Sequence, residues 1–372
     1  MSNPRVNDVV SALYDIANST DKKKAKAVRA KDFDLKLEGI ALTSWNMRES
    51  DYKSDPCPFP LMARGLFTRK TAEGENLIVL RGYDKFFNLG ETKYTQWTWL
   101  EENTVGPYEL TSKENGCIIF IAAVTESELV VTSKHSIAEP VDDEHHHAGV
   151  GYRWLLKHLE YAGRSISELS AWLYSQNVTM IAELCDDEFE QHVLEYPPEQ
   201  RGLYLHGINY NEVILRTMAS DQVREVGREW GFRTVPYKIL PDLQSVREIE
   251  EALRHEDKFE NRRVEGVVIR CRRKDDDTTF FFKIKNDTYN EWREWREITK
   301  AILSEKNYRC RYERSIYYAH WVKARLNDHP EWFTEYKHSK NITFIRDEFE
   351  KYWEEGNLIN SGDPCSGVNR AA

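Results

Sequence analysis

A lysine with a glycine three positions later, in Lys113-Glu114-Asn115-Gly116, is the stretch of this chain whose residue types most directly suggest chemistry. The lysine amine can act as a nucleophile that carries a nucleotide, and the glycine lets the chain turn close to a phosphate or sugar. Lys-x-x-Gly alone has little specificity, because chance produces it in most chains of this size. An amine is almost fully protonated at neutral pH, so this one needs burial or neighbouring positive charge to react.

Two lysines farther along the chain, Lys283 and Lys285, are the candidates for that positive charge. They lie two residues apart in an apolar run that is expected to be a strand, so both side chains point to the same face. Two lysines on a half-buried face are costly unless an anion lies between them, which suggests a phosphate. The alternative is a strand with one solvent-facing side.

Two glutamates accompany expected strands. Glu183 follows the β-branched run 178–182, and Glu265 opens Glu265-Gly266-Val267-Val268-Ile269-Arg270. A carboxylate in such a place can hold a magnesium ion, directly or through water, or accept hydrogen bonds from ribose hydroxyls. For either residue alone, an ordinary surface glutamate is the alternative.

The elements expected to position these residues are mostly short strands, with helices between them. Apolar or aromatic runs bounded by turn residues predict strands at residues 77–80, 94–99, 117–121, 128–133, 178–182, 202–207, 264–270 and 280–284. Helical spacing predicts an amphipathic helix within residues 1–38, and further helices at 148–177, 220–230, 246–254 and from 290 onward. We therefore expect a β-rich α+β domain over residues 1–289 and a helical C-terminal domain over residues 290–372.

Composition narrows the class of protein. The 372 residues are 40% hydrophobic, enough for a packed core, and contain neither a long apolar run nor an N-terminal signal peptide. The six cysteines are scattered without a Cys-x-x-Cys pair, which disfavours a disulfide framework or a zinc site and fits a reducing compartment. We expect a cytoplasmic or nuclear monomer with no membrane insertion.

The charge distribution suggests a polyanionic partner. The formal net charge is −10, yet residues 261–325 hold 17 Lys and Arg against 10 Asp and Glu. A basic segment in an acidic chain indicates a local site for a polyanion. A helix face with mixed, solvated charges is the alternative.

The order of these motifs resembles signature motifs I, III, IV and V of the covalent nucleotidyltransferases, which comprise DNA ligases, RNA ligases and mRNA capping enzymes. Ala63-Arg64-Gly65-Leu66-Phe67 and residues 81–88 are similar to the region before the nucleophile in bacteriophage RNA ligases. Four more segments closely resemble the N-terminal ligase domain of fungal tRNA ligases: residues 99–103, 133–136, 194–196 and 292–297. The similarity runs from residue 42 or so to residue 300.

The resemblance implies a nucleotidyltransferase domain with an ATP-grasp-like ligase fold of antiparallel sheets flanked by helices, followed by an all-helical domain that recognises the RNA end. It implies three in-line displacements at phosphorus, which depend on positioning and on neutralised charge. Lys113 takes AMP from ATP, the AMP passes to an RNA 5′-phosphate, and the 3′-hydroxyl of another RNA displaces it. The substrates would be tRNA exon halves or spliced mRNA exons.

By the same resemblance, the nucleotide is bound by Arg64, Lys85, Asn115, Gly116, Glu183, Glu265, Lys283 and Lys285. Lys283 and Lys285 would neutralise the α-phosphate, and Glu183 would hold the ribose. Glu265 would orient water on Mg²⁺, with Glu183 as the second candidate for holding the metal and Mn²⁺ as a possible substitute. Two ions can act in such a site, one at the α-phosphate and one on the departing pyrophosphate.

Fungal tRNA ligases also require a 2′-phosphate beside the 3′-hydroxyl, and this calls for a second cationic site. Arg293 and Arg296 are three apart on an expected helix, with Lys300 one turn further, so the three share a face. Arginine is suited to bidentate capture of phosphate. Ion pairs of the two arginines with Glu294 and Glu297 are the alternative.

Three departures refine the assignment. The chain has no Gly-x-x-x-x-Gly-Lys-Ser/Thr loop and no pair of His-x-Thr motifs, so we expect the kinase and cyclic phosphodiesterase modules of fungal tRNA ligases to be absent. Asn115 stands where DNA ligases and capping enzymes usually have Asp, which favours the RNA-ligase branch. The residues after Lys300 predict helices, not an OB-fold. An mRNA guanylyltransferase and a catalytically inactive RNA-binding module remain as alternatives.

Two other features are given plainer interpretations. The triplet His145-His146-His147 is interpreted as a polar loop, because no partner ligands appear at the spacing of zinc proteases. The tryptophans and tyrosines after residue 290 could stack on RNA bases, but their helical spacing favours a packed core.

Overall fold

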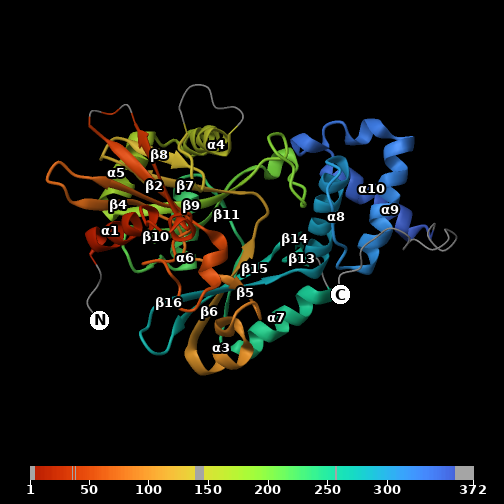
Figure 1. Cartoon of the computed structure of the whole chain (residues 1–372), viewed down its shortest axis with the longest axis horizontal. Helices are drawn as coiled ribbons and strands as arrows, with labels where there is room; N and C mark the ends of the chain where they lie inside the picture. The colour runs from red at the N-terminus through yellow and green to blue at the C-terminus, as the bar shows by residue number, and fades with distance from the viewer. Residues whose placement is uncertain (1–4, 36, 38, 139–145, 256–257, 357–372) are drawn as a thin grey trace.

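The structure is a computed structural model that describes residues 5–35, 37, 39–138, 146–255 and 258–356. Figure 1 shows a body of sheets with helices on their outer faces, and a group of helices formed by the C-terminal part of the chain. Within the described residues, no helix combines the length and the apolar character needed to cross a membrane.

The first sheet is antiparallel and holds four strands in sequence order. Helix α1 lies against it, and the buried Val9, Leu13 and Ile16 are the apolar positions that predict this helix. The strands are β1 Val28–Asp34, β2 Ala41–Met47, β3 Leu66–Lys70 and β4 Asn76–Arg81, with α1 Val6–Ala17, α2 Lys22–Ala25 and the 3₁₀ helix η1 Glu49–Lys53 beside them.

The second sheet has the strand order β11-β10-β9-β7-β8 and is antiparallel except where β11 joins β10. Its central strands are almost wholly buried, and α4, α5 and α6 pack on it. The bounds are β7 Cys117–Ala123, β8 Leu129–Thr132, α4 His147–Ala162, α5 Ile166–Gln176, β9 Val178–Cys185, η3 Pro198–Gln200, β10 Gly202–Tyr210, α6 Ser220–Glu229 and β11 Arg233–Thr234.

The third sheet has the order β12-β6-β15-β16-β5, antiparallel except for the edge pair β16 and β5. Its elements are β5 Phe87–Asn88, η2 Lys93–Thr95, α3 Trp97–Asn103, β6 Thr104–Lys113, β12 Tyr237–Leu240, α7 Leu243–His255, β15 Gly266–Arg273 and β16 Thr279–Lys285, with the small hairpin β13 Lys258–Phe259 and β14 Arg262–Arg263. Strand β6 ends at Lys113 and β7 begins at Cys117, so the tetrapeptide connects the second and third sheets.

The C-terminal helices are α8 Asp287–Leu303, α9 Glu313–Asp328 and α10 Ile342–Glu354, with the 3₁₀ helices η4 Pro330–Phe333 and η5 Tyr336–His338 between them. Trp292, Trp295, Tyr318 and Trp321 are buried here, as predicted, in a core that also includes Tyr204 of the second sheet. The predicted α+β class with antiparallel sheets and C-terminal helices is confirmed. The proposed domain boundary at residues 289/290 falls inside α8 and stays a prediction.

Several elements differ from the sequence-based predictions. The predicted strand 94–99 is wrong: a capping box between Thr92 and Thr95 starts η2, α3 follows, and the ring of Trp99 packs on Tyr94 and Phe280. The predicted helix 148–177 is two helices, because Gly163 ends α4 in the left-handed conformation. Strands β1 and β6 were not predicted, although β6 carries Lys113.

Candidate functional site

The register of the third sheet brings the chemistry-bearing residues together. Lys113, the last residue of β6, pairs with Gly266 of β15, and Gly266 pairs with Lys285, the last residue of β16. Glu265 directly precedes Gly266. Lys113 therefore meets Glu265 and Lys285, which come from a hairpin much later in the sequence, at one end of three adjacent strands. A Cβ atom on Gly266 would lie 2.1 Å from the Ile284 carbonyl oxygen, so this close alignment requires glycine.

Glu265 lies between two of the predicted lysines. Its Oε2 is 2.9 Å from Nζ of Lys113, and its Oε1 is 2.9 Å from Nζ of Lys285. Burial alone would raise the pKa of this carboxyl, but the two ammonium groups outweigh burial and lower it to about 2. The carboxylate is therefore ionised and shared by two cations.

The protonation of Lys113 differs from the sequence-based expectation. Burial would lower the pKa of its amine, but the charges of Glu265 and Glu183 outweigh burial and raise it. Lys283 responds in the opposite way, because burial and the charges of Lys113, Lys285 and Lys85 lower its pKa to about 7. Lys113 therefore holds its proton, and Lys283 is the lysine that gives one up most readily.

Glu183 faces the same centre from the second sheet. Its Oε1 accepts a hydrogen bond of 3.1 Å from the backbone N–H of Gly116, and its Oε2 lies 3.8 Å from Nε2 of His206. Burial raises the pKa of Glu183 to about 7, although Lys113 opposes the shift. A carboxyl that is half ionised near neutral pH can gain a proton, or give one up, as charge arrives beside it.

Position 116 must be glycine because the backbone of a neighbouring strand lies against it. A Cβ atom at this position would lie 2.0 Å from the Leu184 carbonyl oxygen and 2.8 Å from its carbonyl carbon. The close approach that excludes a side chain therefore comes from the pairing of β7 with β9, which begins at Cys117 and Leu184. The sequence-based expectation was an approach to a phosphate or sugar.

Asn115 is buried and its polar groups are bound within the protein. Its Oδ1 accepts from the backbone N–H groups of Val193 and Leu194 at 3.0 and 3.1 Å, and its Nδ2 donates to the hydroxyl of Tyr289 at 3.0 Å. These bonds fasten the turn after Lys113 to the loop beyond β9 and to helix α8. The geometry favours a positioning role for Asn115.

A cavity of about 290 Å³ lies next to Lys113, between the second and third sheets. Three phenyl or phenol rings and the imidazole of His206 line it. The ring centroid of Tyr83 lies 5.3 Å from that of Phe281 and 6.0 Å from that of Phe86. Arg64, Lys134, Glu183 and Arg270 add charge to the wall. A cavity with flat apolar walls and a cationic rim fits a planar base that carries phosphates.

Glu49 is a site residue that the sequence did not reveal. Its two carboxylate oxygens bind Arg64 at 3.0 Å, Lys85 at 3.2 Å and, through a short ion pair, Lys134. Burial would raise the pKa of Glu49, but the three cations outweigh burial and lower it to about 2. The predicted residues Arg64 and Lys85 are thus held together with a third cation on one side of the cavity.

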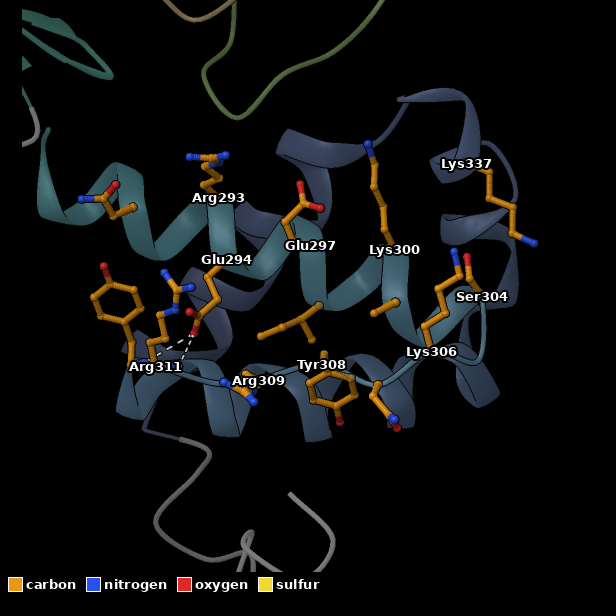
Figure 2. A pocket seen from close by; sticks show the side chains of 15 residues that line it. Arg293, Glu294, Glu297, Lys300, Ser304, Lys306, Tyr308, Arg309, Arg311 and Lys337 are labelled. Carbon is orange, nitrogen blue, oxygen red and sulfur yellow. Dashed lines mark hydrogen bonds between the residues drawn. The ribbon is translucent and has the colours of Figure 1, made fainter. Parts of the chain in front are cut away.

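The predicted cationic face of helix α8 is divided between two environments. Arg293 and Lys300 project to the same side of α8 in Figure 2 and line a surface hollow of about 1020 Å³. Arg296 lies near Cys117 and His192 and pairs with Glu297 at 2.9 Å. Glu294 accepts hydrogen bonds from the backbone N–H groups of Arg311 and Tyr312 (Figure 2), and no ion pair joins it to Arg293 within the described residues. The alternative of ion pairs along the helix is therefore confirmed for Arg296 with Glu297 and not for Arg293.

Helix α8 also lies close to Lys285, which shares the carboxylate of Glu265 with Lys113. Lys285 has a lowered pKa, chiefly through burial, and the charge of Arg293 lowers it further. Asn115 bonds to Tyr289, which is in the first turn of α8. The cationic helix therefore begins beside the end of β16 that holds Lys285.

The histidine triplet is only partly a loop. His145 lies outside the described residues, but His147 is the first residue of α4 and its Nε2 lies 2.7 Å from Oε2 of Glu190. The interpretation as a polar loop is wrong for His147. Its partners come from other segments, which a search for short-range ligand spacing does not find.

Comparison with known proteins agrees with this geometry. A family model described as RNA ligase matches residues 62–290. The chain is 38% identical over 351 residues to tRNA ligase 1 of Schizosaccharomyces pombe, an alignment that covers 88% of this chain and 45% of that protein. It is 34% identical over 383 residues to the tRNA ligase of Candida albicans, with 95% and 45% covered. The chain thus spans about half the length of these curated relatives.

Solved structures support the fold. Two forms of an archaeal ATP-dependent RNA ligase superpose with TM-scores of 0.50 and 0.51, at 16% and 14% sequence identity. Each superposition covers 90% of this chain and 78% of the archaeal one. At this level of identity the likeness concerns the fold alone.

Proposed function

Because this chain belongs to the RNA ligase family, we propose that it is an ATP-dependent RNA ligase domain that seals tRNA exon halves. The observation that carries the proposal is the alignment of Lys113, Glu265 and Lys285 across three strands, beside a cavity with aromatic walls. The names of the two fungal relatives, both tRNA ligases, support tRNA as the substrate.

The first step would use Lys113 as the nucleophile. Its Nζ would form a bond to the α-phosphorus of ATP while the bond to the bridging oxygen breaks and pyrophosphate leaves. The amine must first lose the proton that Glu265 and Glu183 now stabilise. We place the base against Tyr83, Phe86 and Phe281, which line the cavity beside the lysine.

The remaining cations would neutralise phosphate charge. Lys283 and Lys285 lie on β16, which β15 separates from the strand of Lys113, and the charges of Lys113 and Lys85 both act on Lys283. Arg64 and Lys85 form ion pairs with Glu49 on the other side of the site. Displacement at phosphorus gains most from fixed charges of this kind, because their orientation is set before the reaction. Asn115 and Gly116 would keep the lysine turn in place.

A divalent cation, Mg²⁺ or Mn²⁺, fits the two carboxylates. Oε2 of Glu183 lies beyond hydrogen-bonding distance of His206, at 3.8 Å, and both glutamates act on Lys113. Glu265 and Glu183 would hold the ion directly or through water. When bound, the ion would counter the charge of these carboxylates and of the phosphates, and so lower the pKa of Lys113.

The second and third steps would transfer AMP to RNA and seal the strand. A 5′-phosphate oxygen would attack the α-phosphorus and free Lys113, and a 3′-hydroxyl oxygen would then attack the 5′-phosphorus and release AMP. We assign the 2′-phosphate beside that hydroxyl to Arg293, Arg296 and Lys300 on α8. Arg293 supports this assignment most directly, since its charge reaches Lys285 while its side chain lines the open hollow in Figure 2.

The nucleotide and the chemistry can be tested together. The protein is incubated with labelled ATP or labelled GTP and Mg²⁺, and the covalent label is followed on denaturing gels. Labelling by ATP, transfer of the label to a 5′-phosphate RNA and sealing to a 2′-phosphate end would support the proposal. Labelling by GTP alone would indicate a guanylyltransferase, and no labelling with either nucleotide would indicate an inactive RNA-binding module.

A further inference from the structure

A cluster of metal-ligand side chains lies beside the lysine turn and outside the nucleotide cavity. Cys117 begins β7, His147 begins α4, and Glu190 lies in the segment after β9. One donor atom from each of the three lies within 4.8 Å of the other two. The contacts are 3.6 Å from Sγ of Cys117 to Oε2 of Glu190, and 2.7 Å from that oxygen to Nε2 of His147.

A second imidazole joins the thiol. Nε2 of His192 lies 3.5 Å from Sγ of Cys117. Its other nitrogen, Nδ1, lies 3.2 Å from the backbone carbonyl oxygen of Glu190, which can accept a hydrogen bond from it. That bond would place the proton on Nδ1 and leave the lone pair of Nε2 directed at the thiol, the arrangement seen in histidines that bind metals.

The distances suit a tetrahedral ion. With bonds of about 2.3 Å to sulfur and about 2.1 Å to nitrogen or oxygen, the sulfur of a tetrahedral Zn²⁺ site lies about 3.6 Å from each other ligand. The two separations from Sγ of Cys117, 3.5 and 3.6 Å, match this value. The contact of 2.7 Å between His147 and Glu190 is a hydrogen bond, and it would lengthen by about 0.7 Å on metal binding.

The surroundings provide support for the ligands. Oε1 of Glu190 lies 3.4 Å from Oγ of Ser339, and the ring of Phe189 packs edge-on against that of His147. Both contacts restrict the orientation of a ligand side chain, as residues behind metal ligands do.

From this geometry we propose that Cys117, His147 and Glu190 form a site for Zn²⁺. His192 contacts the thiol but lies outside the group of donor atoms within 4.8 Å of one another, so its ring must shift toward the ion to become the fourth ligand. One thiolate, one carboxylate and two neutral imidazoles give a ligand charge of −2, which balances the ion. A neutral site is compatible with Arg296, whose charge acts on Cys117 and His192. The thiol releases its proton to solvent when the ion binds.

The site is distinct in chemistry from the carboxylates around Lys113. Magnesium prefers oxygen ligands and competes poorly for a site that contains a thiol. Since Cys117 directly follows Gly116, the ion would link β7, α4 and the segment after β9 behind the lysine turn. The inference does not depend on the proposed ligase function.

Cobalt titration tests the proposal, because Co²⁺ adopts zinc sites and reports a bound thiolate through a charge-transfer absorption. Chelator-treated protein with excess Mg²⁺ is titrated with Co²⁺, and Zn²⁺ is then added to displace it. We expect one equivalent of Co²⁺ with thiolate absorption in the parent protein and in Cys57→Ser, the matched control at a partly exposed free cysteine elsewhere. Cys117→Ser should lose the absorption.

A second variant tests whether Cys117→Ser loses metal binding only because it misfolds. The side chain of His147 is 42% exposed, so His147→Gln is expected to leave the fold intact while it weakens Co²⁺ binding at least about 10-fold. Zn²⁺ should raise the Tm of the parent and of Cys57→Ser, but not that of Cys117→Ser. Absence of stoichiometric binding, or thiolate absorption that survives in Cys117→Ser, would overturn the proposal.

Discussion

The two groups of cations that we assign to phosphate differ in how the protein holds them. Around Lys113, the charges are buried, paired with carboxylates and fixed by the register of three strands. On α8, Arg293 is exposed and borders an open hollow, and no ion pair is recorded for it within the described residues. In the first group, carboxylates of the protein already neutralise the lysines before a ligand binds. Arg293 would gain a negatively charged partner only when a phosphate binds.

This difference predicts different sensitivities. Charges in the buried cluster act on one another, so one substitution there should change the chemistry of the whole cluster. A substitution on α8 should change which RNA end is accepted and leave the reaction with ATP in place. The following predictions are arranged from the largest expected effect to the smallest.

Removal of the central carboxylate should have the largest effect. Glu265→Gln leaves Lys113 and Lys285 without their shared negative charge in a buried site, which costs about 3–5 kcal/mol. We expect the rate of adenylylation to fall about 1000-fold, measured in single turnover with labelled ATP. Glu297→Gln on the exposed face of α8 is the control and should keep the parent rate. A Glu265→Gln rate within 10-fold of the parent would show that the cluster does not depend on this charge.

Neutralising the two arginines of α8 should separate binding of the RNA end from the first step. Arg293→Ala with Arg296→Ala should slow sealing of 2′-phosphate ends about 100-fold or more, since each charge-assisted contact to a phosphate contributes about 1.5–3 kcal/mol. Adenylylation of Lys113 should remain within a few fold of the parent rate. If adenylylation is lost as well, the arginines serve the fold or the nucleotide.

Filling the glycine behind the nucleophile should destabilise the protein. Gly116→Ala places a Cβ atom 2.0 Å from the Leu184 carbonyl oxygen, so the strands must separate. We expect the free energy of unfolding to fall by about 1–3 kcal/mol, measured by urea titration. Gly227→Ala on α6 is the matched control, because its new Cβ would meet only side-chain atoms, at 3.0 Å or more. Equal stability of both variants would contradict the strand contact.

The lowered pKa of Lys283 predicts a pH dependence of stability. Its pKa is about 7 in the folded state, against the ordinary lysine value of 10.5 in the unfolded chain. Between these values the unfolded chain binds the extra proton, so the contribution of Lys283 to stability rises with pH, by at most about 1.4 kcal/mol per unit. Lys283→Met should remove this rise between pH 7 and 10. An unchanged slope in the variant would contradict the shift.

The sequence predicted the residues at the centre of the site through the order of its motifs, although strand β6, which carries Lys113, was not predicted. Lys113, Glu265 and Lys285 each stand at a strand end, and the pairing of β6, β15 and β16 brings them together. The alternation of strand residues also placed Lys283 and Lys285 on one face. The fold class and the C-terminal aromatic core followed from periodicity in the same way.

The contacts that the sequence did not reveal join segments with no pattern in common. Glu49 lies in a short 3₁₀ helix and meets Lys134 from 85 residues away. Cys117, His147 and Glu190 come from a strand, a helix end and an irregular segment. Local propensity also failed at residues 94–99, where a capping box and ring packing outweigh the strand preference of aromatic residues.

The central claim is that Lys113 carries AMP, and intact mass measurement tests it most directly. The parent protein and Lys113→Ala are incubated with ATP and Mg²⁺, and their masses are compared before and after addition of pyrophosphate. The account predicts that the parent gains the mass of one AMP and loses it again with pyrophosphate, while Lys113→Ala stays unchanged. A gain of AMP by folded Lys113→Ala, or no gain by the parent, would contradict it.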